Sequence, residues 1–110
     1  MAAVVAPLHG AVELKQIAAG RFAAHGPFTF TTARRAREAG LKALQATSPG
    51  QFEIDCGGIT SSDSAGMTVL LDWLAAAKHS GRALRYTNLP EQVQELARIT
   101  DVLELLEKGV

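Results

Sequence analysis

The chain has 110 residues, and its eleven basic and eleven acidic side chains give a formal net charge of zero. This length fits one domain, and the charge balance provides no overall field that would attract nucleic acid or an anionic bilayer. Its one cysteine, Cys56, excludes an internal disulfide and favours a reducing compartment. We expect no signal peptide, and no apolar run is long enough for insertion into a membrane. The composition therefore predicts a cytoplasmic protein that recognises a partner by shape and local charge.

The first ten residues show little periodicity and contain a proline and a glycine. We expect an irregular lead-in at residues 1–10, followed by a single domain at residues 11–110. Apolar and polar residues then alternate on both sides of Ala18-Ala19-Gly20, a pattern typical of two short strands joined by a turn. We expect this hairpin to run from Val12 to His25, with Gly26-Pro27 closing it.

From Phe30 to Ala46 small and apolar residues recur every three or four positions between charged ones, which predicts an amphipathic helix. The segment from Phe52 to Asp55 predicts a short strand, and Gly57-Gly58 predicts a loop after it. A second helix is expected from Ser64 to about His79. The remaining elements are expected as a strand at 83–87, a helix at 91–99 opened by Asn88 and Pro90, and a last helix at 102–107 capped by Asp101.

Strands alternate with helices after the hairpin, which implies parallel pairing through right-handed crossovers. We therefore predict an α/β fold in which a small mixed β-sheet with an N-terminal hairpin packs against about four helices.

The helix expected at 64–79 carries two apolar stripes, and one of them can face the sheet. The other stripe consists of Met67, Leu71 and Leu74 and needs either a neighbouring helix or a second protein. Such residues could simply fill the core. Two full stripes on a domain this small favour a docking face, which could also meet a second copy of the chain in a homodimer.

No pattern in the sequence indicates catalysis. Its histidines, at His9, His25 and His79, have no carboxylate at a recognisable spacing, and with one cysteine they form no metal-ligand cluster. The glycines at Gly57-Gly58 lack the lysine and hydroxyl residue of a phosphate-binding loop. We expect no enzyme activity, no cofactor and no metal.

The most informative stretch is Asp63-Ser64-Ala65-Gly66, which joins a predicted strand to the apolar helix. A helix start exposes unpaired amide donors and carries roughly half a positive charge. Ser64 therefore suits either helix capping or direct contact with a partner, and Asp63 suits either the helix dipole or an arginine of a partner. A side chain at position 66 could hold the loop away from the facing backbone.

This motif, the strand before it, the apolar helix after it and a later strand closing in Asn88-Leu89 resemble the STAS domain family over about residues 11–107. Family members that act as anti-sigma factor antagonists usually carry a phosphorylatable residue directly before the motif glycine, where this chain has Ala65. The hydroxyl one place earlier, at Ser64, is more similar to the MlaB-type subunit of the lipid-asymmetry ABC transporter. Alanine cannot be phosphorylated, so phosphorylation would have to fall on Ser64.

The resemblance implies a non-catalytic accessory subunit that binds and supports the cytoplasmic ATPase of a phospholipid-transporting ABC transporter. Such a subunit would be peripheral to the inner membrane through its protein partner. The alternative is an anti-sigma factor antagonist with a kinase-like anti-sigma partner, and a third hypothesis is a scaffold for a small apolar or nucleotide ligand near the helix start. The predicted contact surface comprises Asp63, Ser64, Ala65, Gly66, Met67, Leu71 and Leu74.

Overall fold

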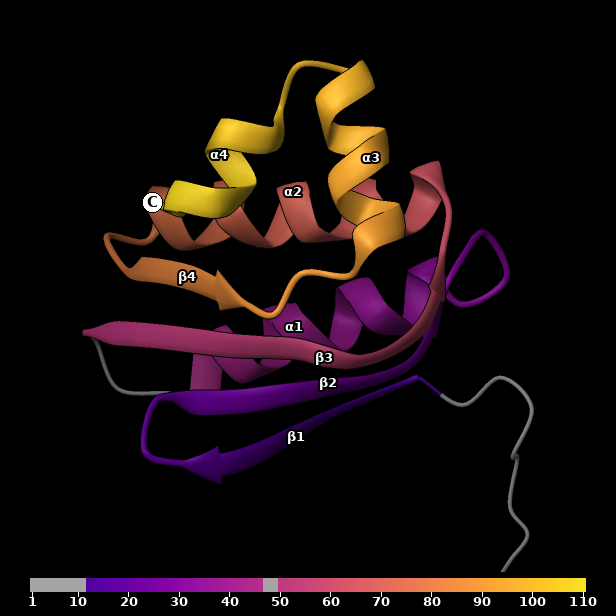
Figure 1. The fold of residues 1–110 in the computed structure, drawn as a ribbon. Coiled ribbons are helices and arrows are strands. Elements are labelled where there is room, and N and C mark those ends of the chain that lie inside the picture. Colours follow the sequence, from indigo (N-terminus) through magenta and orange to yellow (C-terminus); the bar gives the residue numbers. More distant parts are fainter. Residues whose placement is uncertain (1–11, 47–49) are drawn as a thin grey trace, which may run out of the picture.

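The computed structural model describes residues 12–46 and 50–110, in which a four-stranded sheet packs against helices (Figure 1). The predicted lead-in of residues 1–10 lies outside the described residues. In chain order the elements are β1 (Glu13–Ala18), β2 (Arg21–Phe28), α1 (Ala33–Ala46), β3 (Gln51–Ser62), α2 (Ser64–His79), β4 (Ala83–Thr87), α3 (Glu91–Ile99) and α4 (Leu103–Lys108).

The strands lie in the order β1-β2-β3-β4. β1 pairs antiparallel with β2, whereas β3 is parallel to both β2 and β4. The N-terminal hairpin and the parallel pairing of the later strands are therefore confirmed. With four helices around a mixed sheet, the predicted α/β fold is confirmed as well.

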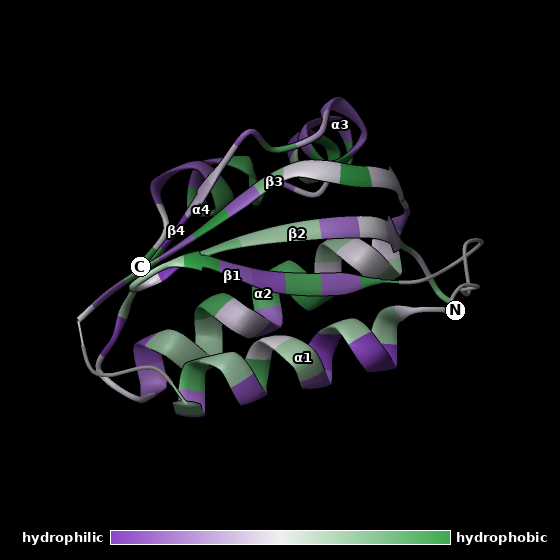
Figure 2. Cartoon of the chain, turned by 90° about the horizontal axis from the view of Figure 1, so that it is seen from below, coloured by the Kyte–Doolittle hydropathy of each residue, from purple (hydrophilic) through white to green (hydrophobic). Residues whose placement is uncertain are grey.

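The helices are distributed unevenly around the sheet. α1 and α2 lie along one face of it, while α4 lies beyond the β4 edge, next to α3 (Figures 1 and 2). At that edge Leu84 and Val110 exchange two backbone hydrogen bonds of 3.2 and 2.9 Å, so the C-terminus pairs with β4. The opposite sheet face carries charged residues of the described strands, including an Arg21–Glu53 ion pair of 3.2 Å. Alternating buried and exposed strand residues thus give the sheet one core face and one solvated face.

Trp73 of α2 joins α1 to the core by packing and by a hydrogen bond. Its indole nitrogen donates a 3.2 Å hydrogen bond to the carbonyl oxygen of Arg37, and its ring meets Phe28 edge-on at 5.7 Å. The ring also covers Gly40 so closely that a Cβ there would overlap it. The small residues of α1 therefore allow a close approach of two helices, and the indole fills the space between them.

The predicted loop at Gly57-Gly58 is wrong, because β3 continues through both glycines to Ser62. The pairing of β2 with β3 shifts register at this place, and a Cβ on Gly58 would lie only 2.7 Å from the carbonyl oxygen of Ala24. The glycines therefore mark a bulge with close backbone contact rather than the end of the strand. β2 likewise runs through Gly26-Pro27 to Phe28 instead of closing there.

Two predicted helix starts also differ. α1 begins at Ala33 rather than Phe30, because Thr32 holds the preceding residues in a turn. α4 begins at Leu103 with Val102 at its cap position and no side-chain cap. Asp101 has a positive φ of 64° and lies in the turn before α4, so the prediction that it caps this helix is wrong.

Candidate functional site

Asp63 is the residue that caps α2. Its backbone is extended, with φ −133° and ψ −169°, and one carboxylate oxygen accepts a 3.0 Å hydrogen bond from the amide of Gly66. The other oxygen accepts a 3.0 Å bond from the amide of Phe30 in the turn before α1. This bond from Phe30 contributes most to lowering the pKa of the Asp63 carboxyl, and the bond from Gly66 adds to it. The carboxylate is therefore held in its charged form at the positive end of the helix.

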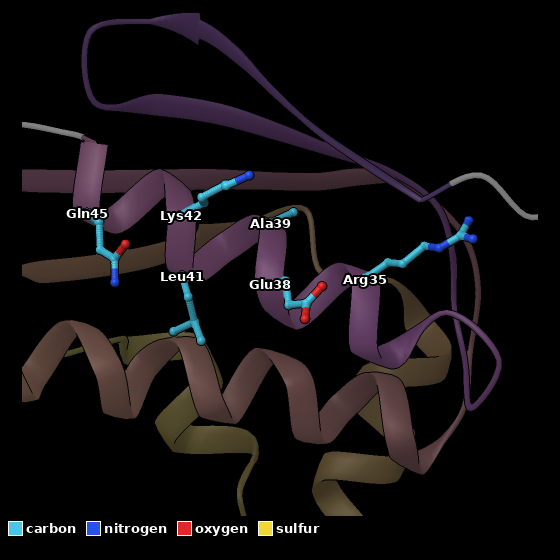
Figure 3. Close-up of a pocket in the computed structure, with 6 residues that line it drawn as sticks. All are labelled: Arg35, Glu38, Ala39, Leu41, Lys42 and Gln45. Carbon is cyan, nitrogen blue, oxygen red and sulfur yellow. The ribbon is translucent and has the colours of Figure 1, made fainter.

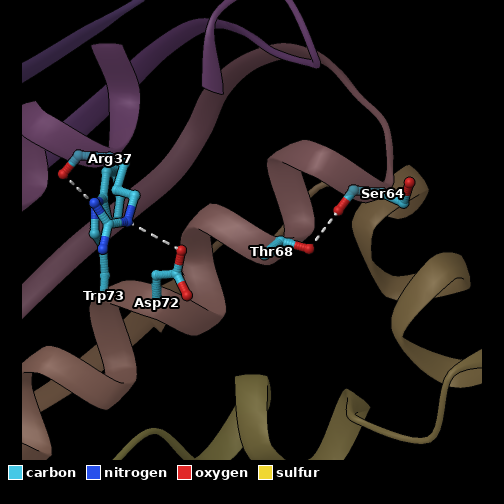
Figure 4. A network of polar contacts seen from close by, with 5 residues as sticks. All are labelled: Arg37, Ser64, Thr68, Asp72 and Trp73. Carbon is cyan, nitrogen blue, oxygen red and sulfur yellow. Dashed lines mark hydrogen bonds and ion pairs between the residues drawn. The ribbon is translucent and has the colours of Figure 1, made fainter. Parts of the chain in front are cut away.

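Ser64 is the first residue of α2, and its side chain is exposed. Within residues 12–46 and 50–110 its hydroxyl takes part in no hydrogen bond, whereas its carbonyl oxygen accepts a 2.9 Å bond from the hydroxyl of Thr68 (Figure 4). One turn further along, Asp72 pairs with Arg37 at 3.2 Å. Of the two roles that the sequence leaves open for Ser64, capping is wrong because Asp63 performs it. Contact with a partner stays a prediction.

Gly66 brings the start of α2 against the end of β2. A Cβ at this position would overlap the carbonyl oxygen of Phe28, so the close backbone approach expected for this glycine is confirmed. Ala65 beside it is half-buried. Of the four motif residues, Ser64 alone is exposed, and the contacts of Asp63 and Gly66 fix the helix start that carries it.

The predicted docking stripe on α2 is not exposed. Met67 and Leu74 retain 5% and 1% of their accessible surface, and Leu71 is half-buried against the core. The physical reason is that α2 is covered by the sheet, by α1 and by α3, so neighbouring helices of the same chain satisfy its second apolar stripe. The expectation that Met67 and Leu74 face a partner is therefore corrected.

The exposed apolar side chains near the start of α2 come from other elements. Phe30 is 82% exposed in the turn between β2 and α1, and Ile99 is 81% exposed at the end of α3. Sequence reasoning missed both, although a signal for Ile99 existed. Ile99 follows the buried Ala97 by two positions, about 200° around a helix, and therefore points away from the core. The helical spacing that begins at Phe30 predicts a helix there, and it gives no signal that this residue lies in a turn.

A groove of about 370 Å³ opens between the start of α2 and α3. Glu95, Leu96 and Ile99 of α3 form one wall of it, and Asp63 and Ser64 lie on the other. The amide of Ser62 at the end of β3 donates a 3.0 Å hydrogen bond to the side chain of Gln92, which ties the walls together. The fold thus places the motif beside an exposed apolar residue in a partly acidic hollow.

A family model described as "Mlab, STAS domain" matches residues 13–107. The chain belongs to the MlaB-type STAS domain family. Members of the STAS family are typically regulatory, non-catalytic domains that act through protein interactions.

Three solved structures share the fold. A protein from Thermotoga maritima that is assigned as an anti-sigma factor antagonist has a TM-score of 0.70. It is 13% identical over 87% of this chain and 83% of that one. The antagonist SpoIIAA in its unphosphorylated form has a TM-score of 0.61 and 12% identity, covering 81% and 83%. A sulfate transporter family protein from Wolinella succinogenes has a TM-score of 0.61 and 20% identity, covering 84% and 75%. No curated protein matches the chain significantly.

A second hollow, of about 530 Å³, runs along this MlaB-type domain's α1 helix (Figure 3). All of its lining residues belong to that one helix, so it is an open helix surface that cannot enclose a ligand. Its lining comprises Arg35, Glu38, Ala39, Leu41, Lys42 and Gln45.

The one cysteine of this MlaB-type domain, Cys56, is free and buried. Burial raises the pKa of the Cys56 thiol to about 12, and the negative charge of Asp55 adds to this shift. The thiol is therefore protonated and is no nucleophile in the native state. Among the described residues, no group of three or more histidine, cysteine or acidic residues is arranged to hold a metal. No helix in the described part of the chain is long and apolar enough to cross a membrane.

Proposed function

We propose that this chain is an MlaB-like accessory subunit that binds and supports the cytoplasmic ATPase of a phospholipid-transporting ABC transporter. The observation that carries the proposal is the state of Ser64: its side chain is exposed at the helix start, and its hydroxyl has no hydrogen-bond partner in the part of the chain that the structure describes. Ala65 stands where antagonists of the family usually carry their phosphorylatable residue, which supports a constant contact over a regulated one. The match to the MlaB type of the family points in the same direction.

The proposed subunit acts by contact. Asp63 fixes the start of α2, Gly66 holds it against β2, and Ser64 is then presented to the partner in one geometry. ATP hydrolysis belongs to the partner, and the chain is peripheral to the inner membrane through that partner. We further propose that residues 11–110 act as one STAS domain preceded by a lead-in.

Copurification with the ATPase subunit of a phospholipid ABC transporter from the same organism tests this proposal. We expect a stable complex that Ser64→Arg abolishes, because a long cationic side chain at an exposed contact leaves no room for the partner. Ser80→Arg is the matched control, since Ser80 lies at the opposite end of α2 and a cation suits a helix C-terminus. The absence of a complex with the wild-type chain rejects the proposal, and equal binding of Ser64→Arg rejects the assigned contact.

The second candidate is an anti-sigma factor antagonist with a kinase-like partner, and the structural neighbours of that type favour it. Its specific requirement is a hydroxyl that a kinase can reach, and the exposed Ser64 provides one. Intact-mass measurement after incubation with an anti-sigma kinase and ATP separates the candidates. A stoichiometric phosphate that Ser64→Ala removes identifies the regulator, whereas an unmodified chain that copurifies with the ATPase identifies the accessory subunit.

A further inference from the structure

The exposure of Phe30 is built into the fold. The turn that carries it is anchored from both sides: the buried Thr32 hydroxyl donates to the carbonyl oxygen of Pro27 at 2.7 Å and accepts from the amide of Thr29 at 3.0 Å. The amide of Phe30 itself is bound to Asp63. A large apolar side chain held in water by a fixed backbone loses little conformational freedom on binding a partner. Phe30 therefore has the properties of a preorganised anchor.

Ile99 borders the same motif from the other side. It lines the groove together with Asp63 and Ser64, and 81% of its surface is exposed. Its helix is fixed on the core by Val93 and Ala97, both fully buried, so the exposed position of Ile99 is as rigid as the helix. Two apolar side chains that are each more than four-fifths exposed thus flank the start of α2, on separate elements.

The charge around the groove has one sign. The described residues that line the groove include Asp63 and Glu95 and no basic side chain. The imbalance extends along the chain, because residues 91–110 carry five acidic and two basic side chains whereas residues 1–90 carry six acidic and nine basic ones. A chain of zero net charge therefore has an acidic C-terminal helical region, and this region meets the motif at the groove.

We infer that Phe30 and Ile99 are the apolar anchors of a docking surface around Asp63 and Ser64, and that the partner presents apolar side chains next to arginine or lysine. The inference rests on the proposed function, since it describes the partner of the same site. Apolar anchors supply most of the affinity at such interfaces, and complementary charge adds orientation and association rate. Ser64, which lines the groove together with Ile99, adds an exposed hydroxyl as a hydrogen-bonding group.

The test measures the affinity of the purified ATPase subunit for the full chain and for three variants, Phe30→Ser, Ile99→Ser and Glu95→Lys. We expect each to weaken binding about tenfold or more. The matched controls are Leu105→Ser and Glu107→Lys on α4, an exposed apolar and an exposed acidic residue outside the groove. These should bind within about twofold of the wild type. Added salt should weaken wild-type binding more than binding of Glu95→Lys, because the variant has lost an attractive charge.

The outcomes separate this inference from the proposed function. If Phe30→Ser, Ile99→Ser and Glu95→Lys bind as the wild type does while Ser64→Arg does not, the docking surface is overturned and the ATPase partnership stands. If the chain forms a concentration-dependent dimer that Ile99→Ser removes, the groove is occupied by a second copy and the inference is overturned.

If the ATPase does not bind the wild-type chain, the proposed function fails and a partner-independent measurement decides the inference. Isotope-labelled full chain is titrated with a short peptide rich in leucine and arginine, and with its leucine and glutamate analogue. Shifts confined to Phe30, Ser64 and Ile99 with the arginine peptide alone support the surface. Equal or scattered shifts overturn it.

Discussion

The carboxylate of Asp63 and the backbone amide of Phe30, 33 positions apart in the sequence, are joined by a hydrogen bond of 3.0 Å. The same carboxylate caps α2 through the amide of Gly66. One side chain thus fixes both the start of α2 and the turn that presents Phe30. The geometry of the proposed contact surface is therefore set before any partner arrives.

Asp63→Ala should lower the free energy of unfolding at pH 7 by about 1 kcal/mol, the usual cost of losing a helix cap. Because hydrogen bonds lower the native pKa of Asp63 below its ordinary value of 3.8, the stabilisation is fully present above that value. It is lost as the pH falls through the lower native pKa, so the difference between variant and wild type should shrink below about pH 4. Urea unfolding at several pH values measures this. The exposed Glu38, replaced by alanine, is the control, and a difference that stays constant with pH contradicts the assignment.

Gly66→Ala should destabilise the fold severely, by about 3 kcal/mol or more, because the added methyl group overlaps a backbone oxygen that cannot rotate away. Gly57→Ala is the matched control, since a Cβ there would meet only the side chains of Asp55 and Asn88, at 3.1 Å or more. Thermal unfolding followed by circular dichroism compares the two. Similar melting temperatures for both variants would show that α2 and β2 can separate at low cost.

The second half of the fold could be predicted closely from the sequence. The bounds of α2, β4 and α3 are confirmed to the residue, because capping residues, Ser80-Gly81 and Pro90 mark their ends locally. β3 could not be predicted in the same way. Its glycines look like a loop in the sequence, and the close approach of β2 that keeps them in the strand depends on residues more than thirty positions away.

The position of the candidate site could be predicted from the sequence, but not all of the residues that are exposed there could. The motif at 63–66 identifies the start of α2, and periodicity places Met67 and Leu74 on one side of that helix. Periodicity cannot say which neighbours cover that side, and here α1 and α3 do so. The helical phase of Ile99 relative to Ala97 signals its exposure, whereas Phe30 lies in a turn, where tertiary packing decides whether a side chain meets water.

Cys56 should be inert in the folded protein. Its thiol is buried, and with a pKa near 12 it is almost entirely protonated at pH 8. We expect no reaction with Ellman's reagent under native conditions and one equivalent after unfolding in urea. The native rate should follow the opening of the core, so destabilising Gly66→Ala should accelerate it. Rapid stoichiometric labelling of the native wild type would contradict this burial.

Gly40→Ala should loosen the contact between α1 and α2, because the added methyl group overlaps the ring of Trp73. The ring must move from its hydrogen bond to Arg37, and we expect a loss of about 1–3 kcal/mol in unfolding free energy. Trp73 is the only tryptophan, so its fluorescence reports both the native environment and the unfolding midpoint. Gln45→Ala, at an exposed position of α1, is the control and should change neither. An unchanged emission spectrum in Gly40→Ala would mean that the indole does not occupy the space over the glycine.

Substitutions at Ser64 should affect partner binding without a matching loss of folding stability. Its hydroxyl has no hydrogen-bond partner among the described residues, so Ser64→Ala should change the free energy of unfolding by less than about 0.5 kcal/mol. Ser64→Asp should raise it by about 0.3–1 kcal/mol, because a negative charge in the first turn complements the helix dipole. Chemical denaturation tests both, with Thr68→Ala one turn further along as the control.

If Ser64→Ala weakens the complex with the ATPase subunit while its unfolding curve matches the wild type, the hydroxyl serves the partner. A large loss of stability would instead make Ser64 a structural residue and remove it from the contact surface.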